Sequence, residues 1–343
     1  MGMKIITENI GPLKGRFYLD LNSPVTVLAG DTGTGKSFLL RILQLLISEL
    51  AESLDVSRLE DKLCEEFGSI ESIISTGEEE GRVTLEYNGE TIADVLHHRL
   101  LGDGSSAHGK QITVNKWRGG IAPYSDLAKR SIIIPDARIA IARMVMEEGH
   151  VSRLSPSEGI YAEFLCSLRN NNDWSLNESL EALRREGVLL KAGRSCFNKG
   201  IIEGLDSRVQ SGAVFAFLSL APAIKILHEG RAFLVAVDTI ETQITPFLQG
   251  VIAVNLARWA KMGWKNKESP APLLLVTHSS TVLAALSKEI EEGVDDRAVY
   301  VKERVEKSDV RTVVLYREDG EVKWGISEGI AMPAYLREYI RLI

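Results

Sequence analysis

The chain has 343 residues, of which 45% are hydrophobic and 25% are charged, a composition typical of a globular protein with a large core. Its formal net charge is −7, which disfavours a surface built to neutralise nucleic-acid phosphates. No apolar run is long enough to cross a membrane, and the first residues lack the apolar core of a signal peptide. We therefore expect a cytoplasmic protein without a membrane span. The three cysteines form no C-x-x-C pair, which predicts neither a disulfide framework nor a zinc site.

Residues 1–54 predict three short strands, at about 4–8, 16–21 and 25–28, and then a helix over 36–54. Between the third strand and the helix, the sequence matches the phosphate-binding loop G-x-x-x-x-G-K-[ST]. The glycines of such a loop let backbone N–H groups turn toward the β-phosphate, the lysine reaches the β- and γ-phosphates, and the serine hydroxyl ligates Mg²⁺. The dipole of the following helix adds positive potential. We expect these residues to bind ATP: Gly30, Asp31, Thr32, Gly33, Thr34, Gly35, Lys36, Ser37 and Phe38.

The middle of the chain gives a weaker pattern. An apolar-periodic stretch at about 59–74 precedes a strand over 82–87, and Asn88-Gly89 after it indicates a hairpin turn. Residues 132–134 form another apolar strand, and helical patterns follow to about residue 190. Within them, Ser175 and Glu178 have the spacing of a helix-capping box.

Two apolar strands in the second half of the chain end in residues that suit a nucleotide site. The strand over 233–237 ends at Asp238, whose carboxylate is expected to hold Mg²⁺ together with Ser37. The strand over 273–276 leads to His278. Because ligands bind at the carboxyl ends of parallel strands, we expect His278 to face the γ-phosphate. The tail alternates over 312–316 and 322–326, which predicts an antiparallel edge.

The phosphate loop, the strand that ends in Asp238, and the run Val276-Thr277-His278-Ser279 resemble the ABC-type ATPase heads of the SMC and RecF group. The lack of a heptad run points to the small stand-alone ATPases without long coiled coils. Residues 9–13, 132–138 and 238–246 are also similar to segments of such heads. The resemblance implies an α/β P-loop NTPase with a mostly parallel sheet flanked by helices, an N-terminal antiparallel β part and a helical lobe.

The resemblance also implies how the chain is organised and assembles. Residues 1–343 would form a single head. Within it, 1–54 hold the N-terminal strands and phosphate loop, 55–135 a variable insertion with a β-hairpin, 136–210 the helical lobe, and 211–343 the signature, Asp238 and His278. Ser211-Gly212 stands where the family has its signature Ser-Gly. In such heads two subunits enclose two nucleotides, and the signature helix of one faces the phosphates bound by the other. ATP, Mg²⁺ and a second copy of the chain are therefore expected.

Two positions depart from the family pattern. Thr239 stands where the family has the glutamate that activates water, and a hydroxyl is a poor general base near neutral pH. Glu241 and His278 are then the candidate catalytic residues. The glutamine that senses Mg²⁺ is also not evident at the entrance to the helical lobe, where residues 135–136 are Pro-Asp; Gln111 is an alternative.

Three functions remain open. The first is an ATP-driven dimerisation switch with slow hydrolysis. The second is an ATP-binding regulatory or scaffold module with little or no hydrolysis, which Thr239 favours. The third is a DNA-repair or defence-associated ATPase that works with a separate effector such as a nuclease, an inference from fold alone. A GTPase is disfavoured because residues 266–269, Asn-Lys-Glu-Ser, lack the aspartate of the guanine-reading N-K-x-D.

Overall fold

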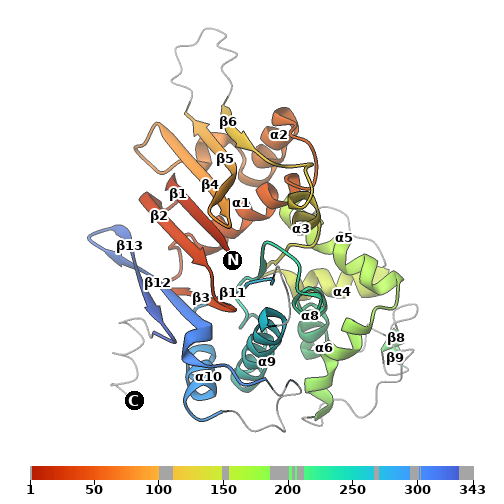
Figure 1. Cartoon of the computed structure of the whole chain (residues 1–343). Coiled ribbons are helices and arrows are strands. Elements are labelled where there is room, and N and C mark those ends of the chain that lie inside the picture. Colours follow the sequence, from red (N-terminus) through yellow and green to blue (C-terminus); the bar gives the residue numbers. More distant parts are fainter. Residues whose placement is uncertain are drawn as a thin grey trace.

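The computed structural model describes residues 2–99, 111–148, 154–185, 201–202, 205–206, 212–265, 270–293, 301 and 303–331. Ser211 and residues 266–269 lie outside the described residues. The described residues form two large sheets and one short two-stranded sheet, with helices around them (Figure 1). None of the helices in these ranges is long and apolar enough to span a membrane.

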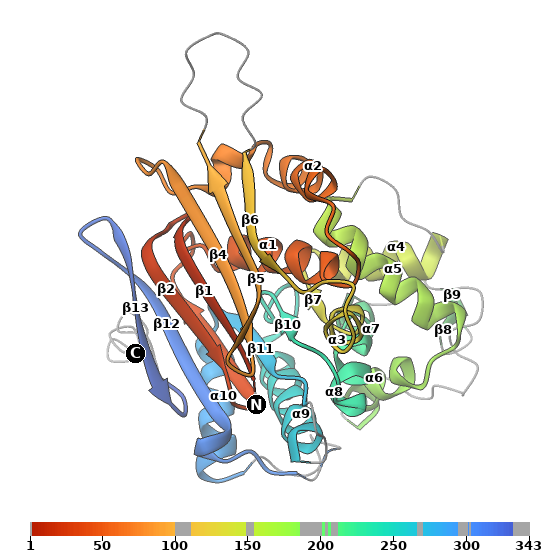
Figure 2. The same cartoon turned by 45° about the horizontal axis from the view of Figure 1, so that its top comes forward.

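The first sheet is antiparallel and has the order β2-β1-β4-β5-β6. Its strands are β1 (Met3–Ile10), β2 (Leu13–Leu21), β4 (Glu80–Tyr87), β5 (Glu90–His98) and β6 (Ile112–Trp117). The turn between β4 and β5 is the predicted hairpin: Asn88 and Gly89 have φ angles of 53° and 80°, the left-handed conformation that favours this dipeptide. Figure 2 shows the strands side by side, with β12 and β13 along the β2 edge.

The second sheet is mostly parallel and has the order β13-β12-β3-β11-β10-β7. Its strands are β3 (Val25–Gly30), β7 (Ile132–Ile134), β10 (Val235–Val237), β11 (Leu273–Thr277), β12 (Val310–Glu318) and β13 (Glu321–Glu328). Only β13 runs antiparallel to its neighbour, since β12 pairs in parallel with β3. Successive side chains of β3 enter different cores: Val27 packs into one and Leu28 into the other. Both faces of this sheet are therefore covered.

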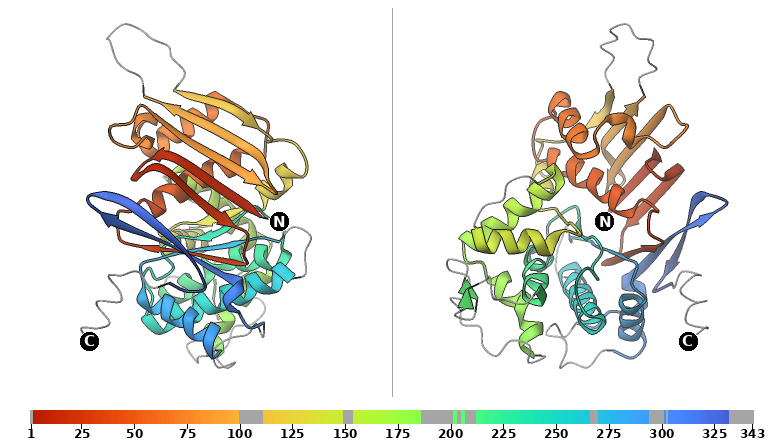
Figure 3. Two further views of the ribbon diagram at one scale, coloured as in Figure 1. Left: turned by 60° about the vertical axis from the view of Figure 1, so that its left-hand side comes forward. Right: turned by 180° about the vertical axis from the view of Figure 1, so that it is seen from behind.

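Helices cover the parallel sheet on both faces. On one face α1 (Lys36–Glu49) lies between the two sheets, next to α2 (Val56–Phe67), the 3-10 turn η1 (Ile70–Ile73) and α3 (Tyr124–Lys129). On the other face pack α8 (Ala221–Glu229), α9 (Pro246–Lys265) and α10 (Ser280–Glu291). Figure 3 shows the antiparallel sheet and helices α8–α10 on opposite sides of the parallel sheet.

A group of helices follows β7 and forms a lobe beside the sheets (Figure 1). It contains α4 (Arg138–Glu148), α5 (Pro156–Asn170), α6 (Trp174–Arg185), the short pair β8 (Ile201–Ile202) and β9 (Leu205–Asp206), and α7 (Gly212–Leu218). A last 3-10 turn, η4 (Lys307–Asp309), precedes β12.

The predicted cap at Ser175 is wrong, because α6 already begins at Trp174. The Asp173 carboxylate accepts a hydrogen bond from the Ser175 N–H at 3.0 Å, as a capping side chain does. Asp and Ser are nearly equal as helix caps, so the sequence alone did not separate them. A complete capping box occurs instead at Ser155 and Glu158, at the start of α5.

Candidate nucleotide-binding site

The phosphate loop runs from the end of β3 to the start of α1 and has a conformation that requires glycine. Gly33 and Gly35 have φ angles of 78° and 93°. A Cβ added to Gly35 would lie 3.1 Å from Pro12 Cδ, in the β1–β2 turn, and one added to Gly30 would lie 2.1 Å from the carbonyl oxygen of Leu315 on β12. Side chains at these positions would clash or strain the backbone, so the glycines let the loop fit between β1, β2 and β12.

Lys36 is the first residue of α1, and its side chain is buried inside the loop. Its ammonium donates hydrogen bonds to the carbonyl oxygens of Gly30 at 3.0 Å and Asp31 at 2.7 Å, and to the Thr34 hydroxyl at 3.1 Å. Burial lowers the Lys36 pKa to about 8, although the carboxylates of Asp238, Asp31 and Glu241 oppose this shift. A cation held in a partly dry loop of carbonyl groups is suited to bind the anionic oxygens of a phosphate.

Asp238 follows β10 directly and is almost completely buried. Burial raises its pKa, as does the nearby charge of Asp136, whereas hydrogen bonds with Ser37 and Thr239 and the charge of Arg138 lower it. The sheet thus brings together the two oxygen donors that the sequence predicted as Mg²⁺ ligands. Asp136, which follows β7, lies close enough to act on the same carboxylate.

A serine hydroxyl and a carboxylate fit Mg²⁺, which takes oxygen ligands and binds through one or two protein groups plus substrate phosphates. No cluster of three or more His, Cys, Asp or Glu side chains that could hold a metal by itself occurs among the described residues. Ser37 and Asp238 therefore fit a magnesium ion that arrives with a nucleotide better than a resident metal centre.

His278 lies just after β11, at the same edge of the sheet. Burial and the neighbouring charge of Lys36 lower its pKa, while the charges of Glu241 and Asp31 and a hydrogen bond with the Gly30 backbone oppose the shift. Because its ordinary pKa is already below 7, the imidazole is mainly neutral at physiological pH. A neutral ring beside Lys36 can still donate a hydrogen bond to a phosphate oxygen.

Glu241 connects the segment after β10 to the end of β11. One carboxylate oxygen accepts a hydrogen bond from the Thr277 hydroxyl at 2.8 Å, and the other accepts one from the backbone N–H of His278 at 2.6 Å. Glu241 thus binds the side chain of Thr277 and the backbone of His278, and so holds the segment that presents His278. The family resemblance pointed to an acid at this position but gave no partner for it.

Thr239, the residue in the place of the usual glutamate, adopts a left-handed conformation with a φ angle of 46°. This conformation is unfavourable for a β-branched residue. The Thr239 hydroxyl donates a hydrogen bond to Asp238 Oδ1 at 3.1 Å, so the side chain is turned toward the predicted magnesium ligand.

Arg138, the first residue of α4, holds the turn at Thr239 through hydrogen bonds. Its buried guanidinium donates hydrogen bonds to the carbonyl oxygens of Asp238 at 3.1 Å, Thr239 at 3.0 Å and Ile240 at 2.7 Å. The side chain therefore links the helical lobe to the segment that carries Asp238. Arg138 entered the sequence prediction only as the last residue of the segment 132–138 that resembles such heads, and this contact was missed because no local signal indicates it.

Gly212 and Gln111, two further residues of the predicted site, belong to other parts of the fold. Gly212 is the first residue of α7, as the signature prediction requires, but Ser211 lies outside the described residues. Gln111, the alternative magnesium sensor, lies directly before β6 in the antiparallel sheet and not on the parallel sheet that carries Asp238.

Neither a family model nor a curated protein matches this sequence. Among solved structures, the SMC head bound to the C-terminal winged-helix domain of ScpA is similar with a TM-score of 0.53 and 11% identity, over 99% of this chain and 100% of that one. The SMC head domain from Thermotoga maritima gives a TM-score of 0.47 and 15% identity, over 96% and 100%. The Smc head with an extended coiled coil bound to the C-terminal domain of ScpA, from Pyrococcus furiosus, gives 0.47 and 11%, over 99% and 97%.

The first of these similarities covers nearly all of both chains, and at 11% identity it is a likeness of fold. The chain has the fold of an SMC-like ATPase head. The predicted fold class is thereby confirmed: a P-loop α/β protein with a mostly parallel sheet flanked by helices and an N-terminal antiparallel sheet.

Proposed function

We propose that this protein binds ATP with Mg²⁺ at the phosphate loop and acts as a nucleotide-driven dimerisation switch with slow hydrolysis. One observation carries the proposal: the parallel sheet brings Lys36, Asp238 and His278 to the carboxyl ends of three adjacent strands, β3, β10 and β11. This is the edge at which open α/β sheets bind their ligands.

Each of these residues has a distinct part in binding a triphosphate. Lys36 exchanges its contacts with loop carbonyls for the β- and γ-phosphate oxygens. The Ser37 hydroxyl and the Asp238 carboxylate would hold Mg²⁺, which would offset the negative charge of the phosphate oxygens. His278 donates a hydrogen bond from its neutral ring at the γ-phosphate, and Glu241 keeps that ring in place through the backbone of residue 278.

Slow hydrolysis follows from the state of the candidate bases. The Thr239 hydroxyl has no titratable proton near neutral pH, and it already donates a hydrogen bond to Asp238. Both oxygens of Glu241 already accept hydrogen bonds from residues 277 and 278. A positioned general base contributes about 10² to 10⁴ in rate, so a site without a free one turns over slowly.

The dimer is proposed from the position of α7, which begins at Gly212 beside α4 of the lobe. In a sandwich of two copies, Ser211 and the N-terminus of α7 of one copy would face the γ-phosphate held by the other. Release after hydrolysis would move whatever effector is attached. A separate effector such as a nuclease, or a role in DNA repair or defence, rests on the likeness of fold and is a further proposal.

A second candidate function keeps the nucleotide but removes turnover. Arg138 binds the Thr239 carbonyl oxygen, and the Thr239 hydroxyl donates a hydrogen bond to Asp238. Because Thr239 offers no general base, its arrangement favours a regulatory or scaffold module that only binds ATP. Such a module would dimerise with ATP and stay closed until the nucleotide exchanged.

One experiment tests both candidates: ATP hydrolysis and oligomeric state are measured together, with and without Mg²⁺ and with and without DNA. We expect an ATP-dependent dimer, slow Mg²⁺-dependent turnover and no stimulation by DNA. A dimer without any turnover would select the regulatory module. Absence of ATP binding in a calorimetric titration of the intact chain would contradict both.

A further inference from the structure

Two neighbouring strands of the parallel sheet, β10 and β7, each lead to an aspartate. The strands pair in parallel with Ile134 opposite Val237, and the Asp238 backbone N–H donates a hydrogen bond to the Ile134 carbonyl oxygen at 2.9 Å. Asp238 is the first residue after β10, and Asp136 is the second residue after β7. The pairing therefore places both aspartates at the edge of the sheet where ligands bind.

The two aspartates also border the same small cavity. Its volume is about 20 Å³, roughly the room of one water molecule. Its lining includes Asp136, Asp238, Gln44 and Arg41 of α1, and Glu158 of α5. The charge of Asp136 raises the pKa of Asp238, as expected for two carboxylates at short range. Asp136 is thus close enough to act on charges that gather at Asp238.

The carboxylate of Asp136 differs from those of Asp238 and Glu241 in having no partner. Asp238 accepts a hydrogen bond from Thr239, and both oxygens of Glu241 accept hydrogen bonds. Asp136 is exposed, and within the part of the chain that the structure describes it has no hydrogen bond or ion pair. The charge of Arg138 acts on Asp136, but its guanidinium already binds three carbonyl oxygens.

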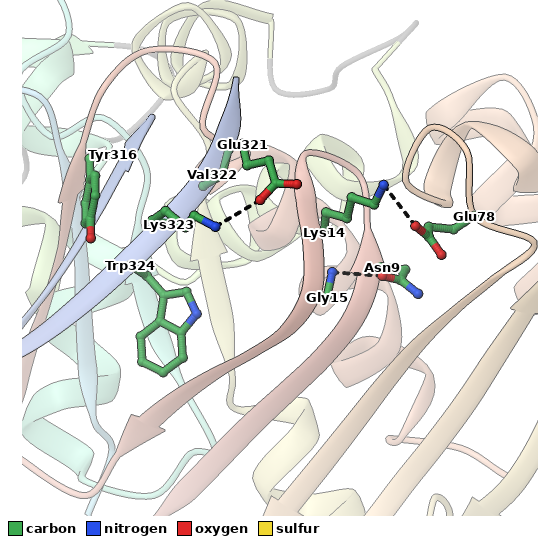
Figure 4. Close-up of a pocket in the computed structure, with 9 residues that line it drawn as sticks. All are labelled: Asn9, Lys14, Gly15, Glu78, Tyr316, Glu321, Val322, Lys323 and Trp324. Atoms are coloured by element: carbon green, nitrogen blue, oxygen red, sulfur yellow. Dashed lines mark hydrogen bonds and ion pairs between the residues drawn. The ribbon is translucent and has the colours of Figure 1, made fainter. Parts of the chain in front are cut away.

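On the other side of β3, the charges near the phosphate loop are balanced. Lys14 pairs with Glu78 at 3.1 Å, and Lys323 pairs with Glu321 at 2.9 Å, between the β1–β2 turn and the β12–β13 hairpin (Figure 4). Arg317 of β12 donates a hydrogen bond to a carbonyl oxygen of the loop at 2.8 Å. Among these groups, the unpaired negative charge lies on the side of β10 and β7.

An unpaired carboxylate at this edge affects a bare triphosphate and a cation-bound one differently. It repels the full negative charge of a free triphosphate, and this repulsion is stronger in a partly buried site than in bulk water. Mg²⁺ cancels part of that charge, and carboxylate oxygens attract the ion. The same side chain therefore opposes one form of the ligand and favours the other.

We propose that Asp136 makes the phosphate loop selective for a triphosphate that carries a divalent cation, because its carboxylate repels ATP without the cation and favours ATP that arrives with one. This inference rests on the proposed binding of ATP with Mg²⁺ at the loop. It gives Asp136 a role in selecting the charge state of the ligand, separate from the proposed roles of Lys36, Ser37 and Asp238 in holding the phosphates and the metal.

Calorimetric titration of the full chain with ATP, in Mg²⁺ and in EDTA, measures this selection as the ratio of the two dissociation constants. Asp136→Asn removes the charge and keeps the shape, so we expect it to lower the ratio about tenfold, with tighter binding in EDTA. Asp136→Glu keeps the charge and should stay within about threefold of the wild-type ratio. Glu321→Gln, which removes an exposed acid on the other side of the loop, is the matched control and should change the ratio less than about twofold.

Ionic strength gives an independent readout of the charge. Because Asp136 is exposed, salt should screen its effect. The difference in the ratio between wild type and Asp136→Asn should therefore shrink when NaCl is raised from about 0.05 M to about 0.5 M. A purely structural effect of the substitution would leave this difference unchanged, and that result would contradict the proposal.

The outcomes separate this inference from the proposed function. A wild-type ratio in Asp136→Asn, together with a large loss of ATP binding in Lys36→Ala, would overturn the role of Asp136 and leave the phosphate site standing. A ratio that falls only through weaker binding in Mg²⁺, with binding in EDTA unchanged, would show no repulsion and would also overturn it. Failure of the wild-type protein to bind ATP in either condition would overturn the proposed function and this inference with it.

Discussion

The carboxylate of Glu241 accepts a hydrogen bond from the backbone N–H of His278 at 2.6 Å, and this contact joins the segments after β10 and β11. The second oxygen of the same carboxylate accepts the Thr277 hydroxyl. An acid that the sequence offered as a catalytic base is thus engaged in placing a histidine. Its contacts support a positioning residue that acts through His278.

Substitution of Glu241 distinguishes positioning from catalysis. An amide at this position can still accept one hydrogen bond, so Glu241→Gln should lower ATP turnover less than about tenfold, whereas loss of a general base costs about 10² to 10⁴. Glu241→Ala, which removes both contacts, should lower turnover further while ATP affinity stays within about threefold. Steady-state rates across pH provide the check. A loss beyond about 10² in Glu241→Gln, with the acidic limb of the rate profile removed, would show that Glu241 is the base.

Lys36→Ala should weaken ATP binding at least about tenfold, because its ammonium is the cation available inside the loop for the phosphate oxygens. The variant should remain folded, since burial already disfavours the charged lysine in the free protein. Calorimetric titration with ATP is the measurement, and thermal unfolding is the control. ATP affinity equal to wild type would remove the main support for a nucleotide at this loop.

The lowered pKa of Lys36 also predicts a dependence of stability on pH. The folded pKa is about 8 and the ordinary value is 10.5, so between these values the unfolded chain holds more protons than the folded one. The contribution of Lys36 to the free energy of unfolding therefore rises as pH increases through this window. Denaturant unfolding of wild type and Lys36→Met should show wild type gaining relative stability from pH 8 to pH 10.5. If the difference in the free energy of unfolding between wild type and Lys36→Met stays constant over this window, the lowered pKa of the buried Lys36 side chain is contradicted.

Arg138→Ala should destabilise the fold by at least about 2 kcal/mol, because it leaves three carbonyl acceptors without the guanidinium that now binds them. Arg130, whose exposed guanidinium lies 3.8 Å from Glu229, is the matched control. Arg130→Ala should cost less than about 1 kcal/mol, as surface ion pairs do. Equal effects of the two substitutions on the free energy of unfolding would show that the contacts of Arg138 add nothing beyond those of an ordinary surface arginine.

The parts of this structure that could be predicted are those with a local signal. The phosphate loop follows from glycine spacing between an apolar strand and a helix, and the β4–β5 turn follows from Asn88-Gly89. The positions of Asp238 and His278 at one edge of the sheet could be predicted because each follows a short apolar strand, and parallel strands end at one edge.

The parts that escaped prediction depend on contacts between distant segments. The partners of Arg138 lie 100 to 102 positions away along the chain, and nothing near residue 138 indicates them. The contact of Arg317 with the loop joins residues 284 positions apart, and it exists because β12 pairs in parallel with β3. The tail was expected only as an antiparallel edge, and no feature of the sequence indicated that it lies beside the loop.

Ser211→Arg tests the proposed dimer. If the N-terminus of α7 faces the nucleotide of a second copy, a long cation there blocks closure by its bulk, while the phosphate loop of each monomer is untouched. ATP binding to the monomer should therefore be normal, and the ATP-dependent dimer should be lost by light scattering with Mg²⁺. Ser207→Arg, placed just upstream in the sequence, controls for the added charge and should leave the dimer intact. A dimer that persists in Ser211→Arg would place the interface elsewhere.

Thr239→Glu addresses the missing general base. Thr239 follows Asp238 directly, and its left-handed turn is held by Arg138, so a carboxylate at this position would stand beside the proposed magnesium ligand. We expect Thr239→Glu to raise turnover at least about tenfold, which is below the full contribution of a positioned base because the turn is strained for any side chain. Thr239→Gln has the same length without a titratable group and should not raise turnover, so the gain must depend on the charge. Turnover that stays at the wild-type level in Thr239→Glu, in a protein that still dimerises with ATP, would mean that the turn directs residue 239 away from the attacking water. Fast hydrolysis by the wild-type protein, insensitive to substitution of Glu241 and of His278, would instead show that another group of this site activates the water.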